Sequence, residues 1–172
     1  MPTTEIPGSP GILYCGKIHY YRLQLQIPFQ GLRGCDGCHS LGHTYLYDCE
    51  LTGTVALNTH NSMSPEYSYI HMFGGKLNSS KASILCAEDG KAVMNLDHAT
   101  IGDIADGNLA FAHAGGRLVA NLAEMNVSGH LDREEKSYLE VNLKNATLTG
   151  KANATVLSLD NTSVWNVTGD SK

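Results

Sequence analysis

The sequence predicts an all-β protein, a right-handed parallel β-helix (a solenoid) of about six coils, and three observations support this fold class. A short phrase, apolar-x-x-small-x-apolar-x-small, recurs along the 172 residues. Within each copy, apolar and polar positions alternate, which is the period of a half-buried strand. Most copies close in Thr-Gly, Ser-Gly or Asn-Ser, which favour turns over helices. A repeat of this length must stack on its neighbours to bury its apolar side.

The copies of the phrase define the expected coils in order. They begin at residues 46, 72, 96, 122 and 143, which gives steps of 26, 24, 26 and 21 residues. The clearest copies are Leu46–Gly53, Leu122–Gly129 and Leu143–Gly150. Weaker copies are Met72–Ser79 and Leu96–Asp103. A final copy opens at Leu159 and, after three extra residues, ends in Trp165–Gly169.

Stacked parallel coils lie about 4.8 Å apart, so equivalent apolar residues should form ladders along the stack. We expect one such ladder to contain Leu51, Leu77, Ile101, Val127, Leu148 and Val167. The glycines and asparagines that close the phrases are predicted to supply the left-handed backbone of sharp corners. The one stretch with helix-like composition, Leu131–Lys136, is predicted to be a loop between coils. An antiparallel sandwich is the alternative fold, but it does not require one phrase at a fixed period.

Two regions differ in kind. Residues 46–172 carry the repeats, whereas residues 1–45 form an atypical segment rich in cysteine and aromatic residues, either a cap or degenerate coils. Four of the five cysteines, Cys15, Cys35, Cys38 and Cys49, lie in the first 50 residues. Two faint echoes of the phrase occur in the atypical segment, at Leu13–Ile18 and Ile27–Gly34.

Composition excludes several classes of function. The formal net charge is -5 at pH 7, with 12 Lys and Arg against 17 Asp and Glu, so we expect no nucleic-acid partner, which would need clustered basic residues. No apolar run is long enough to predict a transmembrane helix. The first residues lack the basic and apolar regions of a signal peptide.

The C-terminal third resembles the passenger domain of bacterial autotransporters of the adhesin and pertactin-like kind. The resemblance rests on Leu143–Gly150 and on the stretch Ala154–Ser171. Within that stretch, an Asn-x-Ser-x-Trp-x-Val-Thr-Gly-Asp-Ser pattern is matched by Asn161, Ser163, Trp165, Val167, Thr168, Gly169, Asp170 and Ser171. The chain departs from the family in lacking a signal peptide and barrel strands and in having five cysteines. We therefore expect a fragment of a longer passenger.

The resemblance implies a non-enzymatic rod that serves as a contact surface for adhesion, aggregation or biofilm formation. The implied partner is a protein or glycan on a host or bacterial surface, or a second copy of the chain. The implied location is the cell surface or outer membrane, or the secreted fraction, with the parent protein anchored by an outer-membrane β-barrel. No catalytic, cofactor-binding or metal-binding residue is expected.

The motif Cys35-Asp-Gly-Cys38-His39 is the sharpest alternative signal. Cys-x-x-Cys-His is the attachment signature of c-type haem. Together with Cys49, the same residues could instead offer four sulfur and nitrogen ligands to zinc. An incidental or disulfide-forming pair is the remaining interpretation, since disulfides persist in oxidising compartments.

A carbohydrate-active β-helix enzyme is the other alternative. Glycosidic acid–base chemistry needs two carboxylates a few Å apart. The best candidates are Asp97, Asp103 and Asp106 with Arg117. Because Asp97 and Asp103 are expected to flank one strand, we do not expect them to converge. Aspartates at turns that accept backbone N–H groups are the simpler interpretation.

Overall fold

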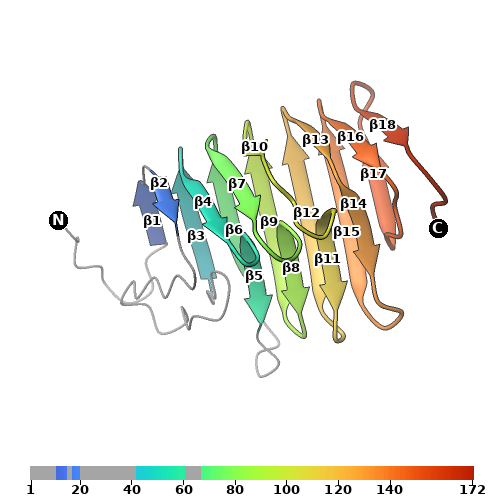
Figure 1. The fold of residues 1–172 in the computed structure, drawn as a ribbon, viewed down its shortest axis with the longest axis horizontal. Helices are drawn as coiled ribbons and strands as arrows, with labels where there is room; N and C mark the ends of the chain where they lie inside the picture. Colours follow the sequence, from blue (N-terminus) through green and yellow to red (C-terminus); the bar gives the residue numbers. More distant parts are fainter. Residues whose placement is uncertain (1–10, 15–16, 20–41, 61–66) are drawn as a thin grey trace.

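The computed structural model of the chain describes residues 11–14, 17–19, 42–60 and 67–172. Over these residues the protein is a parallel β-solenoid without helices (Figure 1). Every strand pair in its sheets is parallel, and strands adjacent in a sheet come from successive coils. The predicted all-β stack of coils is therefore confirmed.

The strands form three faces of the solenoid. The first face is one seven-stranded sheet, the long sheet: β1 (Gly11–Tyr14), β3 (Gly42–Tyr47), β6 (Ser68–Phe73), β9 (Lys91–Asp97), β12 (Arg117–Ala123), β15 (Tyr138–Lys144) and β17 (Val156–Leu159). The second face holds two separate sheets: β2 (Lys17–His19), β4 (Glu50–Gly53), β7 (Lys76–Ser79) and β10 (Thr100–Ile101), then β13 (Asn126–Ser128), β16 (Thr147–Gly150) and β18 (Val164–Val167). The third face holds β5 (Leu57–His60), β8 (Leu85–Glu88), β11 (Asn108–His113) and β14 (His130–Arg133).

The number of coils differs slightly from the expected six. About four turns have a strand on all three faces, from the turn of β3, β4 and β5 to that of β12, β13 and β14. The two turns after them have named strands only on the first two faces, and a single bridge between Leu131 and Ala152 continues the third. The right-handed sense of the solenoid stays a prediction.

The opening residue of the phrase forms the main ladder of the core. Leu46, Met72, Leu96, Leu122, Leu143 and Leu159 are register partners in consecutive strands of the long sheet. The first five are almost completely buried. The period of the phrase therefore equals the length of one coil, as predicted.

The second expected ladder is correct over most of its length and wrong at its end. Leu51, Leu77 and Ile101 are register partners, and so are Val127 and Leu148. No ladder pairing joins β10 to β13, because the second face is divided there. At the last coil Leu148 pairs with Trp165, whereas Val167 pairs with Gly150 and is 55 % exposed. The Trp165 indole packs against the core and donates from Nε1 to the Gly150 carbonyl oxygen at 3.0 Å, which fixes this register.

The corners after the long sheet turn through a left-handed residue at the third position of the phrase. The residues there have φ between 46° and 67°: Asp48, Gly74, His98, Glu124 and Asn145. The prediction that the closing glycines supply this geometry is wrong for Gly53 and Gly150, which do not have positive φ. Gly150 is required for space instead, because an added Cβ would overlap the Gly129 carbonyl oxygen.

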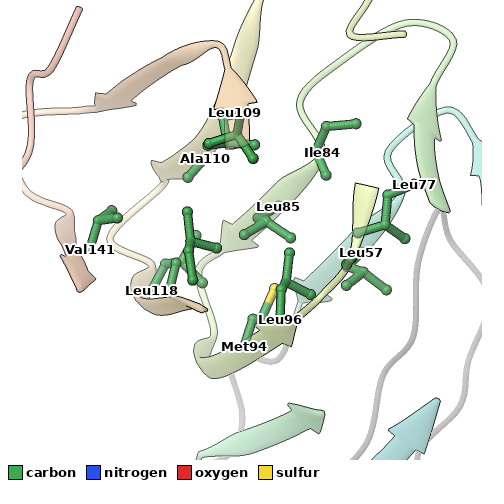
Figure 2. Packing of buried hydrophobic residues seen from close by; sticks show 14 of the residues in the cluster. Leu57, Leu77, Ile84, Leu85, Met94, Leu96, Leu109, Ala110, Leu118 and Val141 are labelled. Carbon is green, nitrogen blue, oxygen red and sulfur yellow. The ribbon is translucent and has the colours of Figure 1, made fainter. Parts of the chain in front are cut away.

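The core is a single column of aliphatic side chains from the inner sides of all three faces. Figure 2 shows Leu77, Leu85 and Leu96, from three different faces, together with Met94 and Leu118. Met94, Leu118 and Val141 are fully buried, while their strand neighbours on the outer side are partly exposed. This alternation confirms the predicted period of two.

The residues that carry the C-terminal resemblance hold the last coil on the one before it. Ser163 Oγ accepts the Ala146 N–H and Ser171 Oγ accepts the Ala152 N–H, both at 3.1 Å. Asp160 accepts from Ser163 Oγ at 2.6 Å and from the hydroxyl and N–H of Thr162. These bonds, that of Ser163 first, lower the pKa of Asp160 to about 2. The motif thus has a structural role in this coil.

The structure confirms one of the two faint echoes of the phrase and corrects the expected loop at 131–136. The echo at Leu13–Ile18 is in register with the repeat, since Leu13 pairs with Leu46 and Ile18 with Leu51, whereas the echo at 27–34 lies outside the described residues. The expected loop 131–136 is shorter than predicted. Leu131 is buried in β14 and pairs with Ala110, because its side chain continues the inner side of the third face.

No helix in the described part of the chain is long and apolar enough to cross a membrane.

Candidate functional site: the outer side of the long sheet

The outer side of the long sheet from β3 to β15, here called the contact face, carries its side chains in regular rows. Because alternate residues of each strand point outward, equivalent outward residues form rows along the stack. One row contains His43, Tyr69, Val93, Val119 and Glu140. The next contains Tyr45, His71, Asn95, Asn121 and Asn142.

Aromatic rings cover the N-terminal end of the contact face. His43 stacks on Tyr69 with ring centroids 4.5 Å apart and planes 10° from parallel. Tyr45 stacks on His71 at 4.6 Å and 11°. Tyr47 stacks on Phe73 at 5.1 Å and 15°.

These distances match the spacing of about 4.8 Å between neighbouring strands, so the ring faces point along the stack and the ring edges point outward. The ring faces are therefore used within the fold. A partner would meet tyrosine hydroxyl groups and the outer edges of the rings rather than flat ring surfaces.

A ladder of three amides continues the aromatic row toward the C-terminal end. Asn142 Nδ2 donates to Asn121 Oδ1 at 2.9 Å, and Asn121 Nδ2 donates to Asn95 Oδ1 at 2.7 Å. Asn95 Nδ2 lies 3.1 Å from His71 Nδ1, and His71 Nε2 lies 3.0 Å from His43 Nδ1. We call Asn95, Asn121 and Asn142 the amide ladder. It connects successive coils through side chains alone, and the two histidines extend it to β3.

Charged and aromatic groups meet at the far end of this ladder. Asn142 Nδ2 also donates to Glu140 Oε1 at 3.1 Å, and Tyr138 Oη donates to Glu140 Oε2 at 2.7 Å. The hydrogen bond from Tyr138, followed by that from Asn142, lowers the pKa of Glu140. The Arg117 guanidinium lies 3.6 Å from the centroid of the Tyr138 ring, in a cation–π contact. Glu140 is therefore held ionised at neutral pH.

The imidazole of His71 is held neutral. Burial, followed by the neighbouring His43, lowers the pKa of His71 below its ordinary value. The neutral form fits its hydrogen bonds, because Nδ1 can accept from Asn95 only when it carries no proton.

This pKa shift predicts that stability falls on mild acidification. The unfolded chain takes up a proton near pH 6.5 and the folded chain takes it up only at lower pH, so stability is full above that range and is lost as pH falls through it. Urea midpoints at pH 7.5 and pH 5.5 should differ more in the native protein than in a His71→Asn variant, which keeps a hydrogen-bonding side chain. Equal losses in both proteins would contradict this assignment, and His113→Asn, on the third face, serves as the control.

Of the four residues of the zinc alternative, Cys49 lies in the described part of the chain. Cys35, Cys38 and His39 lie outside the described residues. Cys49, the fourth ligand of the zinc alternative, is disulfide-bonded and so is not free to bind a metal as a thiolate. Within the described ranges, no group of three or more His, Cys, Asp or Glu residues could hold a metal ion.

Cys86 is a free, buried thiol on the third face. Burial, followed by the charge of Glu88, raises the pKa of Cys86 to about 12. The thiolate is the nucleophilic form of cysteine, so this thiol is inert at neutral pH.

The structure separates two residues of the enzymatic alternative, Asp97 and Arg117. Arg117 begins β12, whereas Asp97 ends the neighbouring β9 and pairs in register with Ala123. The two ends of such a strand pair are about 20 Å apart at 3.3 Å per residue. Asp97 accepts from His98 Nδ1 at 2.6 Å, and Asp106 accepts the Asn108 N–H at 2.8 Å. Asp103 is exposed beyond the short strand β10.

Sequence reasoning missed the contact face, although a signal for it exists. The position immediately before each opening residue of the phrase holds Tyr45, His71, Asn95, Asn121 and Asn142. The column is visible once the copies are aligned, because it advances by the same steps as the phrase. Its members are inconspicuous one by one, since scattered histidines and asparagines are ordinary on a solvated β surface.

Comparison of the chain with protein-family models, with curated proteins and with solved structures gave no match.

Proposed function

We propose that this chain is a non-enzymatic segment of a bacterial surface adhesin, of the autotransporter passenger kind, and that the contact face is its binding surface. The observation that supports the proposal is the register-matched pattern of the contact face. Tyrosine hydroxyls, imidazoles, amides, Arg117 and Glu140 follow one another along successive coils at a spacing of about 4.8 Å. Aromatic residues and arginine are enriched at protein interfaces.

The orientation of the aromatic rings indicates which kind of partner the contact face could bind. Because the rings stack on each other, the face offers a line of hydrogen-bond donors and acceptors around a few aliphatic side chains, Val93 and Val119. Such a line fits an extended partner that runs along the stack, a surface protein or a glycan chain, better than a small molecule held in a pocket. Many weak contacts along a rod also add through multivalency when several rods share one surface.

The test is a binding assay with substitutions on two faces. Beads coated with the protein would be tested for retention on a printed glycan array, on collagen- and fibronectin-coated wells and on beads that carry the same chain. A Val93→Lys/Val119→Lys variant alters the contact face. A Thr147→Lys/Thr149→Lys variant adds the same charge on the outer side of β16, where both threonines are also partly exposed.

We expect the contact-face variant to lose retention by about tenfold, which corresponds to about 1.4 kcal/mol. The β16 variant should bind like the native protein. Equal binding by all three proteins, or retention of none of them on any surface, would contradict the proposed function.

The autotransporter assignment has a separate test in the coding DNA. Downstream sequence that encodes strands of about ten alternating residues with aromatic ends would support it, since that is the pattern of a membrane barrel. Unrelated genes on both sides of the coding sequence would contradict it, and the contact face would then have to be explained in this chain alone.

A further inference from the structure

The amide ladder has a direction. Asn142 donates to Asn121, and Asn121 donates to Asn95. Asn95 presents its Nδ2 to His71 Nδ1, and an amide nitrogen can only donate, so His71 accepts at Nδ1 and carries its proton on Nε2. That proton is then donated to His43 Nδ1. In each of these four hydrogen bonds between coils, the donor belongs to the later coil and points toward the N-terminal end of the stack.

This direction exists only while both histidines are neutral. An imidazolium donates from both ring nitrogens and cannot accept. If His71 is protonated, its Nδ1–H meets the Asn95 amino group, and two donors face each other. If His43 is protonated at Nδ1, it donates to His71 Nε2, which moves the proton of neutral His71 to Nδ1 with the same result.

The conflict is removed when Asn95 turns its amide over, so that Oδ1 accepts from His71. Asn95 Nδ2 then faces Asn121, which must turn in the same way, and Asn142 must follow. Each turn exchanges the donor and acceptor of one residue and makes no new covalent bond. The last turn replaces the Asn142 donor at Glu140 Oε1 with the Asn142 carbonyl oxygen, so the Glu140 carboxylate must rotate away and keeps only the bond from Tyr138 to Oε2.

We propose that the His43–His71 pair sets the direction of the amide ladder, and that acidification reverses the ladder as a unit across β9, β12 and β15. The inference rests on the proposed function for its biological meaning, since the reversal would change the donor and acceptor pattern that the contact face offers a partner. Binding by this face would then depend on pH through residues in several coils, not through the histidines alone.

The charged groups around the pair bond to other residues. Tyr69 stacks on the His43 imidazole and Tyr45 stacks on the His71 imidazole. In the next coil, β9 places Asn95 beside His71, with Val93 and Asp97 as the outward residues before and after Asn95. Asp97 is paired with His98, and Phe73 lies between Asp97 and Tyr47 in the adjacent row. Lys91 lies toward Tyr67, and Arg117 and Glu140 belong to coils beyond Asn95. No carboxylate in the described part of this face hydrogen-bonds to either imidazole.

The test is a titration of the side-chain amide signals of the free protein by NMR from pH 7.5 to pH 5. We expect the Nδ2 signals of Asn121 and Asn142, which touch neither histidine, to shift with the same midpoint as the His71 ring. His71→Asn should abolish these shifts, whereas His113→Asn should leave them unchanged. Far-UV circular dichroism of each variant would show that the solenoid is folded.

A second variant separates reversal from a long-range effect of charge. In Asn121→Val the ladder is interrupted, and valine already occupies the neighbouring outward position 119. Asn95 should still respond to pH in this variant, and Asn142 should not. Asn142 signals that stay fixed in the native protein while His71 titrates, or that still shift in Asn121→Val, would overturn the inference.

The outcomes are distinguishable from failure of the proposed function. The titration uses no partner, so a ladder that reverses in a protein that binds nothing would leave the inference standing and remove the adhesive role. A face that binds its partner equally at pH 7.5 and pH 5, with no titrating amides, would remove the inference alone.

Discussion

Gly75→Ala is expected to destabilise the solenoid by about 3 kcal/mol or more, because a backbone cost of about 1–2 kcal/mol and an overpacking cost of about 1–3 kcal/mol add together. Gly75 has φ of 80°, where an L-residue costs about 1–2 kcal/mol. An added Cβ would also overlap the backbone of Cys49 in the preceding coil, and Lys76 donates its N–H to the Cys49 carbonyl at 2.9 Å across the same gap. The two coils cannot separate at this corner without losing that bond. Chemical denaturation followed by circular dichroism would measure the loss.

Gly115→Ala is the matched control for this effect. Gly115 has φ of 84°, but apart from its own chain neighbours no atom lies within 4 Å of the position that an added Cβ would take, so only the backbone cost applies. We expect a loss of about 1–2 kcal/mol. Similar losses for the two variants would mean that close packing of coils at the Cys49 corner contributes little.

Leu122→Ala is expected to have the second-largest effect, a loss of about 2–5 kcal/mol. Leu122 is 1 % exposed and lies between Leu96 and Leu143 in the main ladder of the core. Its removal would leave a cavity that both neighbouring coils line. Those coils are fixed by seven register pairs each to β12, so they have little freedom to close the cavity.

Leu159→Ala tests the same ladder at its end. Leu159 is 40 % exposed and has a register partner, Leu143, on one side among the described strands. We expect a loss of about 1 kcal/mol or less, because little apolar surface is exposed by the change. Equal losses at positions 122 and 159 would contradict the burial gradient along the ladder.

The stack of coils could be predicted from sequence because one requirement repeats. Each coil must place an apolar residue over its neighbour, so Leu46, Met72, Leu96, Leu122 and Leu143 recur at the length of one coil. Even the faint echo at Leu13–Ile18 obeys this register. The local alternation of apolar residues and the packing between coils require the same residue type at the same positions, so the stack can be predicted from one sequence.

The register of the last coil could not be predicted in the same way. The closing Thr-Gly of the final phrase suggested that Val167 lies over Leu148, but Trp165 occupies that place. A large side chain that buries its ring and bonds the Gly150 carbonyl outweighs the similarity of two turn residues. The division of the second face after β10 likewise has no signature in the phrase.

The candidate site was less predictable than the fold, because its meaning depends on which residues become neighbours. Asn95, Asn121 and Asn142 are ordinary surface residues in sequence, and their bonds exist only when coils stack in register. The interpretation of the aspartates as turn residues that accept backbone N–H groups is confirmed for Asp106, which accepts the Asn108 N–H, whereas Asp97 ends β9 and accepts from the His98 ring instead.

The left-handed corners provide equivalent surface positions at a regular spacing along the stack. The residues at the third position of the phrase, Asp48, His98, Glu124 and Asn145, are exposed and share the same left-handed backbone conformation. Probes attached at 98 and 124 would sit about 4.8 Å apart, and each further coil would add the same increment. Pairwise distances between such probes would therefore report, coil by coil, where the stack opens under load or heat.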